Sequence, residues 1–304
     1  MINLYFMTLF SCGSDISIMK KDEIVDTADK SQNTYIDVPD DTQSTQTQTQ
    51  TQEPSDEPVI EGIGGYVNYY LRQVACPACV GDSQEITVEF NAEFHEPTTS
   101  SHTEWIPDAG TCTDWLLSSS PSTNPIDVGP YVDVMGPNHA FQASKVSLGT
   151  YRTNLYETQY DRVSEHSVNL ANHEETFSFR SIEGFDFIEP FEMLYVDPTY
   201  AFAAPIYRSG MTFTWGPYDT SRLFMITIAV YTPDGSQLLG YAACVGTDQG
   251  FMTFPADLLT SYPQYGLVAI HLARHKVDLI PYQPLNSYIE SHMEWEVVGT
   301  GYLQ

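Results

Sequence analysis

From residue 62 onward, hydrophobic and polar residues alternate with a period of two in several short segments. In 86–94, apolar residues at every second position are separated by Thr, Glu or Asn. Such alternation places one face of an extended segment in a core and the other face in water. Segment 224–230 alternates in the same way, and a Pro-Asp-Gly turn at 233–235 connects it to the similar segment 238–244. Because glycine readily adopts a positive φ, we predict a β-hairpin there.

The rest of this region predicts more strands and very little helix. Short helices are predicted only at 164–172 and 256–261. Gly, Pro, Asn and Asp separate the strands at intervals typical of antiparallel sheets. The predicted fold class is therefore all-β, with one or two antiparallel β-sandwich domains. The additional predicted strands are 131–135, 176–180, 211–215, 267–272 and 289–298.

A domain boundary is predicted within 197–209, where two prolines interrupt the strand pattern. The part after it, 208–304, has the size of an immunoglobulin-like β-sandwich. The part before it, 62–207, is longer, and we predict a sandwich-like domain with a long loop insertion around 98–125.

The N-terminal residues 1–12 are a short apolar run that ends in Leu-Phe-Ser-Cys. The apolar density is that of a signal peptide, and Cys12 has the position of a lipid attachment site. The run is shorter than a complete signal and no Lys or Arg precedes it, so we interpret it as a truncated signal peptide. Residues 13–61 are acidic and rich in Thr and Gln, which predicts a disordered tether. We therefore predict a lipid anchor at Cys12 and an exported body at the outer membrane or cell surface.

Four cysteines remain if Cys12 carries lipid: Cys76, Cys79, Cys112 and Cys244. This even number is typical of an exported protein with two disulfides, and the three possible connectivities stay open. Cys76 and Cys79 have the spacing of a thioredoxin-type redox pair. A strand rather than a helix is predicted after them, so we favour a structural disulfide over redox catalysis.

The chain is strongly acidic, with 40 Asp and Glu against 12 Lys and Arg and a formal net charge of -28. Such a surface repels phosphate backbones and anionic headgroups, which excludes nucleic acid as a partner. We expect the membrane to be reached through the lipid at Cys12, and the body to bind a protein or a glycan. No stretch of about 18 apolar residues predicts a membrane-spanning helix.

The sequence contains no familiar catalytic motif: no Gly-x-Ser-x-Gly, no phosphate-binding loop and no His-Glu-x-x-His. No catalytic residue is therefore nominated, and no cofactor is expected. His271 and His275 lie four residues apart in a predicted strand. Residues at that spacing are about 13 Å apart, so the two histidines are not expected to share one ion.

The last predicted strand places Glu290, His292, Glu294 and Glu296 on one face. Carboxylates around an imidazole could recruit a cation with help from a neighbouring strand, which makes Glu290, His292 and Glu294 candidate ligands. A solvated outer face is the more common explanation of such alternation, and it is our prediction here.

Residues 244–259 resemble a stretch that recurs in uncharacterised Gram-negative lipoproteins with a β-sandwich body. In that stretch a strand cysteine is followed by an Asp-x-Gly turn, an aromatic strand, a proline and a short Leu-Leu helix, as in this sequence. Residues 214–217 and 126–129 fit the same kind of protein. The resemblance covers most of 62–304. It implies a surface-anchored β-sandwich protein and supplies no catalytic residues.

Three functional hypotheses follow from the sequence. The favoured one is a membrane-anchored surface lipoprotein that serves as a binding or structural module. One alternative is a secreted enzyme whose site is built from loops, either a hydrolase or a thiol-disulfide exchanger at Cys76 and Cys79. The other is a calcium-dependent adhesin that uses the acidic surface.

Overall fold

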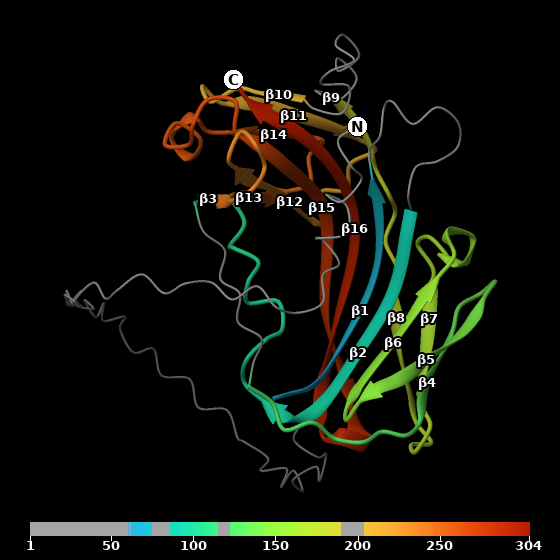
Figure 1. Cartoon of the computed structure of the whole chain (residues 1–304). Helices are drawn as coiled ribbons and strands as arrows, with labels where there is room; N and C mark the ends of the chain where they lie inside the picture. Colours follow the sequence, from blue (N-terminus) through green and yellow to red (C-terminus); the bar gives the residue numbers. More distant parts are fainter. Residues whose placement is uncertain (1–59, 61, 75–85, 115–121, 190–203) are drawn as a thin grey trace, which may run out of the picture. The chain divides into compact units, whose positions relative to one another are not determined.

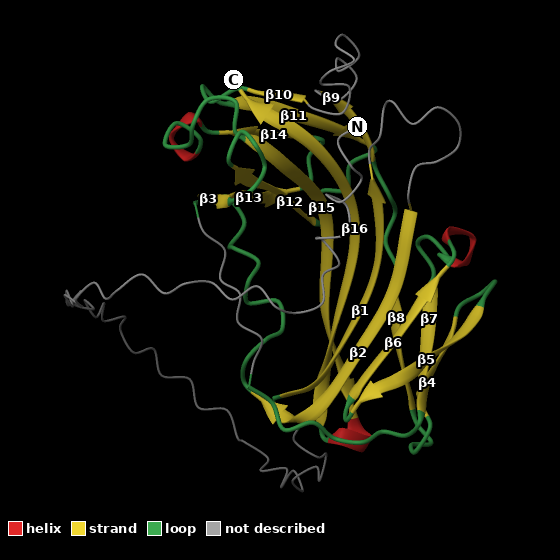
Figure 2. Ribbon diagram, viewed as in Figure 1, coloured by secondary structure: helices red, strands yellow, loops and turns green. Residues whose placement is uncertain are grey.

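A computed structural model describes residues 60, 62–74, 86–114, 122–189 and 204–304. They belong to one compact unit, Val59–Gln304. Within the described residues the only helical elements are three short 3-10 turns, and strands form most of these residues, so the predicted all-β class is confirmed (Figure 2). The 3-10 turns are η3 (Glu157–Gln159), η5 (Ala256–Leu258) and η6 (Gln283–Leu285). The predicted lipid site and tether, and Cys76 and Cys79, lie outside the described residues.

The strands form two sheets (Figure 1). A 13-stranded sheet has the order β3-β13-β12-β15-β16-β1-β2-β6-β5-β4-β7-β8, with β10 also paired to β16, and a three-stranded sheet has the order β14-β11-β9. The strands are β1 (Ile63–Val74), β2 (Ile86–Thr98), β3 (Thr111–Thr113), β4 (Tyr131–Met135), β5 (Ala140–Ser147), β6 (Thr150–Leu155), β7 (Glu165–Leu170), β8 (Thr176–Arg180), β9 (Asp186–Glu189), β10 (Ala204–Ile206), β11 (Met211–Gly216), β12 (Leu223–Tyr231), β13 (Leu238–Thr247), β14 (Phe251–Phe254), β15 (Leu267–Tyr282) and β16 (Ser287–Leu303).

Most predicted strands are present at the expected positions. β4 and β8 have the predicted bounds, and β12 and β13 form the predicted hairpin, with Gly235 at φ 69° in the turn. The helix predicted at 164–172 is wrong, because this segment contains β7, whose buried residues alternate with partly exposed ones. The helix predicted at 256–261 is only the 3-10 turn η5.

The longest strands, β15 and β16, form a hairpin at the centre of the large sheet. The turn between them contains Asn286 in the left-handed region, at φ 47°, a conformation that asparagine tolerates better than most residues. β1 runs parallel to β16 along residues 63–74. The boundary predicted at 207/208 therefore falls inside one compact unit, because β1 and β2 pair within the same sheet as β15 and β16.

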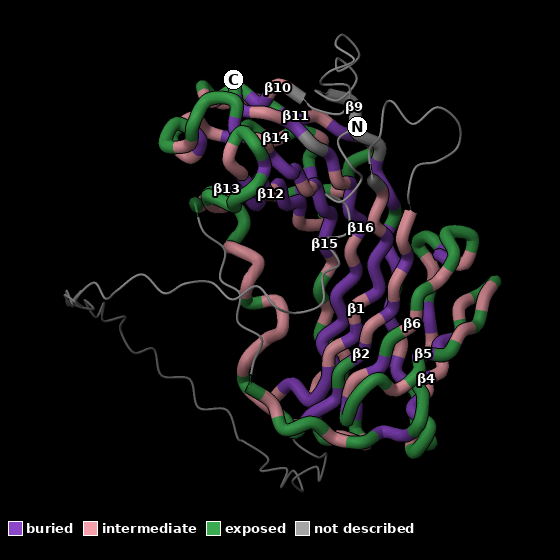
Figure 3. Tube along the Cα trace, viewed as in Figure 1, coloured by how far each residue is buried: buried purple, intermediate pink, exposed green. Residues whose placement is uncertain are grey.

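One face of the large sheet supplies the main apolar core. On β1 the inward residues are Val67, Tyr69 and Leu71, and Phe90 on β2 belongs to the same buried cluster. Trp215 of the three-stranded sheet stacks on Phe224 of β12 with ring centroids 3.6 Å apart. Figure 3 shows buried positions recurring along β15, β16 and β1. The three-stranded sheet and the large sheet therefore share this core.

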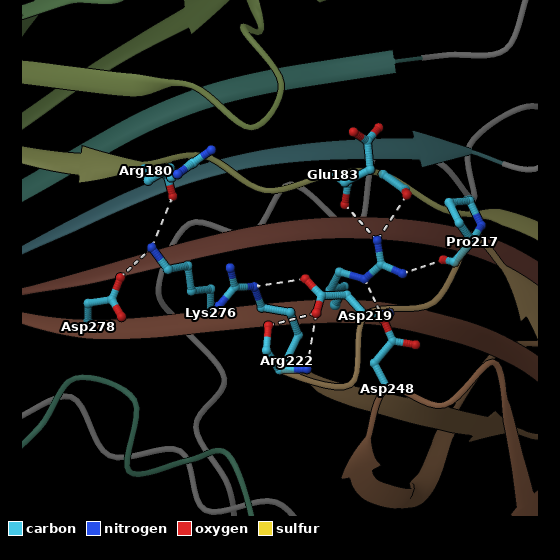
Figure 4. Close-up of polar contacts among 11 residues, drawn as sticks. Arg180, Glu183, Pro217, Asp219, Arg222, Asp248, Lys276 and Asp278 are labelled. Carbon is cyan, nitrogen blue, oxygen red and sulfur yellow. Dashed lines mark hydrogen bonds and ion pairs between the residues drawn. The ribbon is translucent and has the colours of Figure 1, made fainter.

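A buried ion pair joins β15 to the turn between β13 and β14 (Figure 4). Arg274 and Asp248 have side chains that are 1% and 0% exposed, and the Arg274 Nε donates to Asp248 Oδ2 at 2.6 Å. Asp248 also accepts the Trp215 Nε1–H at 2.6 Å. The other guanidinium nitrogens of Arg274 donate to the main-chain oxygens of Glu183, Gly184 and Pro217. Because both charges are so fully hydrogen-bonded, this pair can be buried without a large penalty.

Candidate metal centre

Most of the polar face of β16 is buried, with Glu294 half-buried. Glu290, His292 and Glu296 are 0%, 1% and 4% exposed, so the prediction of a solvated outer face is wrong. The reason lies in a distant segment, residues 99–110, which we call the strap. The strap follows β2 and leads to β3 (Figure 1). Its side chains contact this face of the sheet at Glu290 and His292.

Neighbouring strands add polar side chains to the same face. In β1, Tyr66 is aligned with Glu290 and Asn68 with His292. In β15, His275 lies directly opposite Glu294. Residues paired across adjacent strands project from the same face of a sheet. Three strands therefore bring together side chains that are remote in sequence.

Three of these residues form a candidate metal site. His275, His292 and Glu294 each offer one ligand atom, and the three atoms lie within 4.8 Å of one another. His275 Nδ1 and His292 Nε2 are 2.9 Å apart, and the Tyr66 hydroxyl lies 2.9 Å from His292 Nδ1. The remaining ring nitrogen, His275 Nε2, is buried and has no hydrogen-bond partner among the described residues. Leaving such an atom unpaired costs about 1–3 kcal/mol.

Burial keeps both imidazoles neutral. It lowers the pKa of His275 to about 4, although the Glu296 carboxylate opposes this change. The pKa of His292 lies well below its usual value because of burial and, to a lesser extent, the neighbouring His275. A neutral imidazole has a free lone pair, which is the form that binds metal ions. At neutral pH both rings can act as ligands without first losing a proton.

The third group, Glu294, is half-buried, and its surroundings favour the protonated carboxyl. Burial raises the pKa of its carboxyl to about 8, and the Glu296 carboxylate adds to this effect while Arg72 opposes it. The ionised form of this carboxylate is unfavourable in the protein alone, and a bound cation would compensate its negative charge.

Glu296 has a different role on the same face. It accepts hydrogen bonds from Arg72 Nε and interacts with His271 Nδ1. Burial tends to raise its pKa, but His271 and Arg72 outweigh burial and lower the pKa to about 2. Glu296 is therefore an ionised carboxylate that is already paired, and we do not assign it as a ligand.

Glu290, the remaining candidate from the sequence, is engaged by the strap. Its Oε1 accepts the Thr103 hydroxyl at 2.6 Å, and its Oε2 accepts the backbone N–H of His102 at 3.1 Å. The structure therefore brings His292 and Glu294 together with His275, and ties Glu290 to the strap.

Aromatic rings of the strap close the site. Trp105 lies edge-on to His275 and His292, with ring centroids 5.9 and 6.2 Å away. His102 stacks on Tyr66 with centroids 4.7 Å apart and an interplanar angle of 8°. Trp105 also packs against an apolar patch of Met225, Ala243 and Val245. The cluster is thus enclosed between the sheet and the strap.

The donor set indicates the class of metal. Two imidazole nitrogens and one carboxylate are typical of zinc and related transition-metal ions, whereas calcium takes six to eight oxygen ligands. Zinc lies about 2.0–2.2 Å from such ligands, so tetrahedral ligand atoms are about 3.4 Å apart.

The sequence interpretation did not identify His275 as a partner of His292. The expectation that His271 and His275 do not share an ion agrees with their contacts, since His271 lies against Glu296 and His275 against His292. The missing information was the register of β15 against β16. The turn that pairs Tyr282 with Ser287 sets this register and places His275 opposite Glu294.

A disulfide fixes the segment that follows the strap. Cys112 of β3 is bonded to Cys244 of β13, its direct partner across the two strands. This is one of the three connectivity choices that the sequence left open for Cys112. The predicted export of the protein provides an environment in which such a bond persists.

Within the described residues, no helix has the length and apolarity needed to span a bilayer. No protein-family model matches the chain, and a search of curated proteins finds no significant match.

Proposed function

We propose that this protein is an exported, lipid-anchored binding module whose β body holds a divalent transition-metal ion such as zinc. His275, His292 and Glu294 are the ligands. The observation that carries the proposal is the pair of buried, neutral imidazoles beside a carboxyl group, with His275 Nε2 unpaired among the described residues.

The energetics of the cluster support a bound ion. Without a metal, the two buried imidazoles contact each other, and His275 Nε2 is left without a partner among the described residues at a cost of about 1–3 kcal/mol. A cation would satisfy the ligand atoms and compensate the charge of Glu294. Tyr66 beside His292 is the kind of supporting hydrogen-bond partner that orients a metal-binding imidazole.

The enclosure of the cluster favours binding over catalysis. A catalytic zinc keeps one coordination position open to water and substrate, whereas structural and storage sites are closed. Here the strap lies over the ligands, and His275 and His292 are each 1% exposed. The net charge of -28 would also attract cations toward the body.

Metal titration tests this proposal. The metal-free protein should bind one Zn²⁺ per chain in isothermal titration calorimetry, and a large excess of Ca²⁺ should not compete. His292→Ala and Glu294→Gln should each weaken the affinity at least about 100-fold, since each removes one of three ligands. His173→Ala, which changes a partly exposed histidine beside Tyr282, is the control and should bind like the wild type. Equal affinity in all four proteins would refute the site.

The proposed location has its own test. Cys12 would carry the lipid, and residues 13–61 would form the tether to the outer membrane or cell surface. Metabolic labelling with a fatty acid, in a chain whose complete signal peptide is restored, should label the wild type and not Cys12→Ala. Equal labelling of both proteins would remove the lipid anchor and leave the metal site as a separate claim.

A further inference from the structure

The strap is fixed firmly at its two ends. At its start it continues directly from β2, which is paired on both sides, with β1 and β6. At its end, the Gly110 N–H donates to the Val245 carbonyl at 2.7 Å, and β3 then pairs with β13. The Cys112–Cys244 disulfide lies within that pair.

The middle of the strap is held to the sheet by side chains, without backbone pairing to a strand among the described residues. The backbone bonds from Ile106 N–H to Thr103 and from Thr111 N–H to Asp108 are internal turns rather than bonds to the sheet. Side chains attach the strap to the sheet. His102 and Thr103 bond to Glu290, the His102 ring stacks on Tyr66 and lies 2.9 Å from His95 between their Nε2 atoms, and Trp105 and Ile106 pack on an apolar patch. A segment with few bonds to the rest of a protein opens at a lower free energy than a central strand.

The strap also covers the route to the metal ligands. His275 and His292 are buried beneath it, with Trp105 against both rings. Movement of the strap would therefore uncover both imidazoles to an entering or leaving ion. The disulfide is one residue beyond the start of β3, a strand of only three residues, so the covalent bond contributes strongly to holding this end in place.

We infer that the strap is a gate over the metal centre and that the Cys112–Cys244 disulfide keeps this gate shut. The inference rests on the proposed metal-binding function and assigns a regulation to it. Cys112 is exposed whereas Cys244 is buried, so the bond is open to attack by a thiol from one side. Exposed disulfides are the ones most often used in regulation.

A dithiol reductant would open the gate in a balanced exchange. One of its thiolates attacks a disulfide sulfur, forms a mixed disulfide and displaces the other cysteine as a thiolate. Its second thiol then displaces the remaining cysteine. The protein gains two electrons and two protons as two thiols, and the reductant leaves as its own disulfide.

The experiment compares the kinetics of Zn²⁺ exchange in the wild type and in the Cys112→Ser/Cys244→Ser variant. Zinc release into excess chromogenic chelator is followed by stopped-flow absorbance, and zinc association is measured in the same proteins. We expect both rates to rise at least about tenfold in the variant, with a dissociation constant within about threefold of the wild type. Faster association together with faster release indicates a gate. Opening the strap lowers the free-energy barrier to ion entry and release more than it changes the free energies of the zinc-free and zinc-bound protein.

A second variant keeps the disulfide and weakens the middle of the strap. Thr103→Val removes the hydroxyl that donates to Glu290, and a several-fold acceleration of both rates is expected. Thr253→Val, which changes a surface hydroxyl pair in β14, is the matched control and should exchange zinc like the wild type. This variant also keeps the inference testable if the double serine variant does not fold.

The outcomes separate the two claims. Wild-type exchange rates in every folded variant, together with normal zinc affinity, would overturn the gate and leave the metal site standing. Absence of zinc binding by the oxidised wild type would overturn both. Faster exchange with nearly unchanged affinity would support both.

Discussion

Replacing Arg274 by methionine should be among the most destabilising single changes in the body. The substitution removes the only side chain that forms an ion pair with Asp248 in the described structure, and it leaves that carboxylate buried with 0% exposure. Three main-chain oxygens, of Glu183, Gly184 and Pro217, lose their guanidinium donors at the same time. Removing one partner of a buried pair typically costs about 3–5 kcal/mol.

We therefore expect the free energy of unfolding to fall by about 4 kcal/mol in Arg274→Met, because of the uncompensated charge. For a unit of this size, that corresponds to a decrease in melting temperature of roughly 8–16 °C. Urea unfolding followed by tryptophan fluorescence and circular dichroism measures the change. The two signals should agree if the body unfolds in one transition.

Lys276→Met is the matched control, on the same strand and with the same new side chain (Figure 4). Lys276 pairs with Asp278, whose side chain is 45% exposed, so this loss should cost less than about 1 kcal/mol. The double variant Arg274→Met/Asp248→Asn should recover part of the stability because no unpaired charge remains. A cost below about 1 kcal/mol for Arg274→Met would refute the role of the pair.

Two further predictions concern histidines. Tyr66→Phe removes the hydroxyl next to His292 and should weaken Zn²⁺ affinity about tenfold in calorimetric titration, whereas Tyr131→Phe, which changes an exposed tyrosine of β4, should change it less than twofold; equal effects would contradict the supporting role of Tyr66. His166 has a pKa below its usual value because it is buried, so the folded state binds fewer protons than the unfolded state as the pH falls below about 6.5. Its contribution to stability is complete above that pH and is lost as the pH falls toward the folded pKa. In His166→Phe, the loss of unfolding free energy between pH 7 and pH 5 should be smaller than in the wild type, and an unchanged difference in urea titrations would refute this assignment.

Local sequence patterns were sufficient for many strands. The alternation in 86–94 and 224–230 and the Pro-Asp-Gly turn correspond to β2, β12 and the β12–β13 hairpin. The helix prediction at 164–172 was wrong although the period-two alternation is present there. There the segment Glu165–Leu170 alternates buried and less buried residues and pairs with β4 and β8.

The candidate site was only partly accessible from sequence. His292 and Glu294 lie two residues apart on one strand, so their common face follows from the geometry of a strand. His275 joins them through the register of a hairpin, and its importance could not be read from its own neighbours. Burial of Glu290 and His292 depends on the strap, which is almost 190 residues away in sequence for the Glu290 contacts.

The sequence by itself determined the all-β class, the positions of most strands and the acidic character of the chain. These properties follow from local periodicity, turn chemistry and composition, which act over a few residues at a time. Only the tertiary structure decided that the strands on both sides of 207/208 share one sheet, that Cys112 pairs with Cys244 and that the polar face of β16 is covered. The physical reason is that strand partners and burial are set by contacts between remote segments, and period-two alternation is the same whether a polar face meets water or another part of the chain.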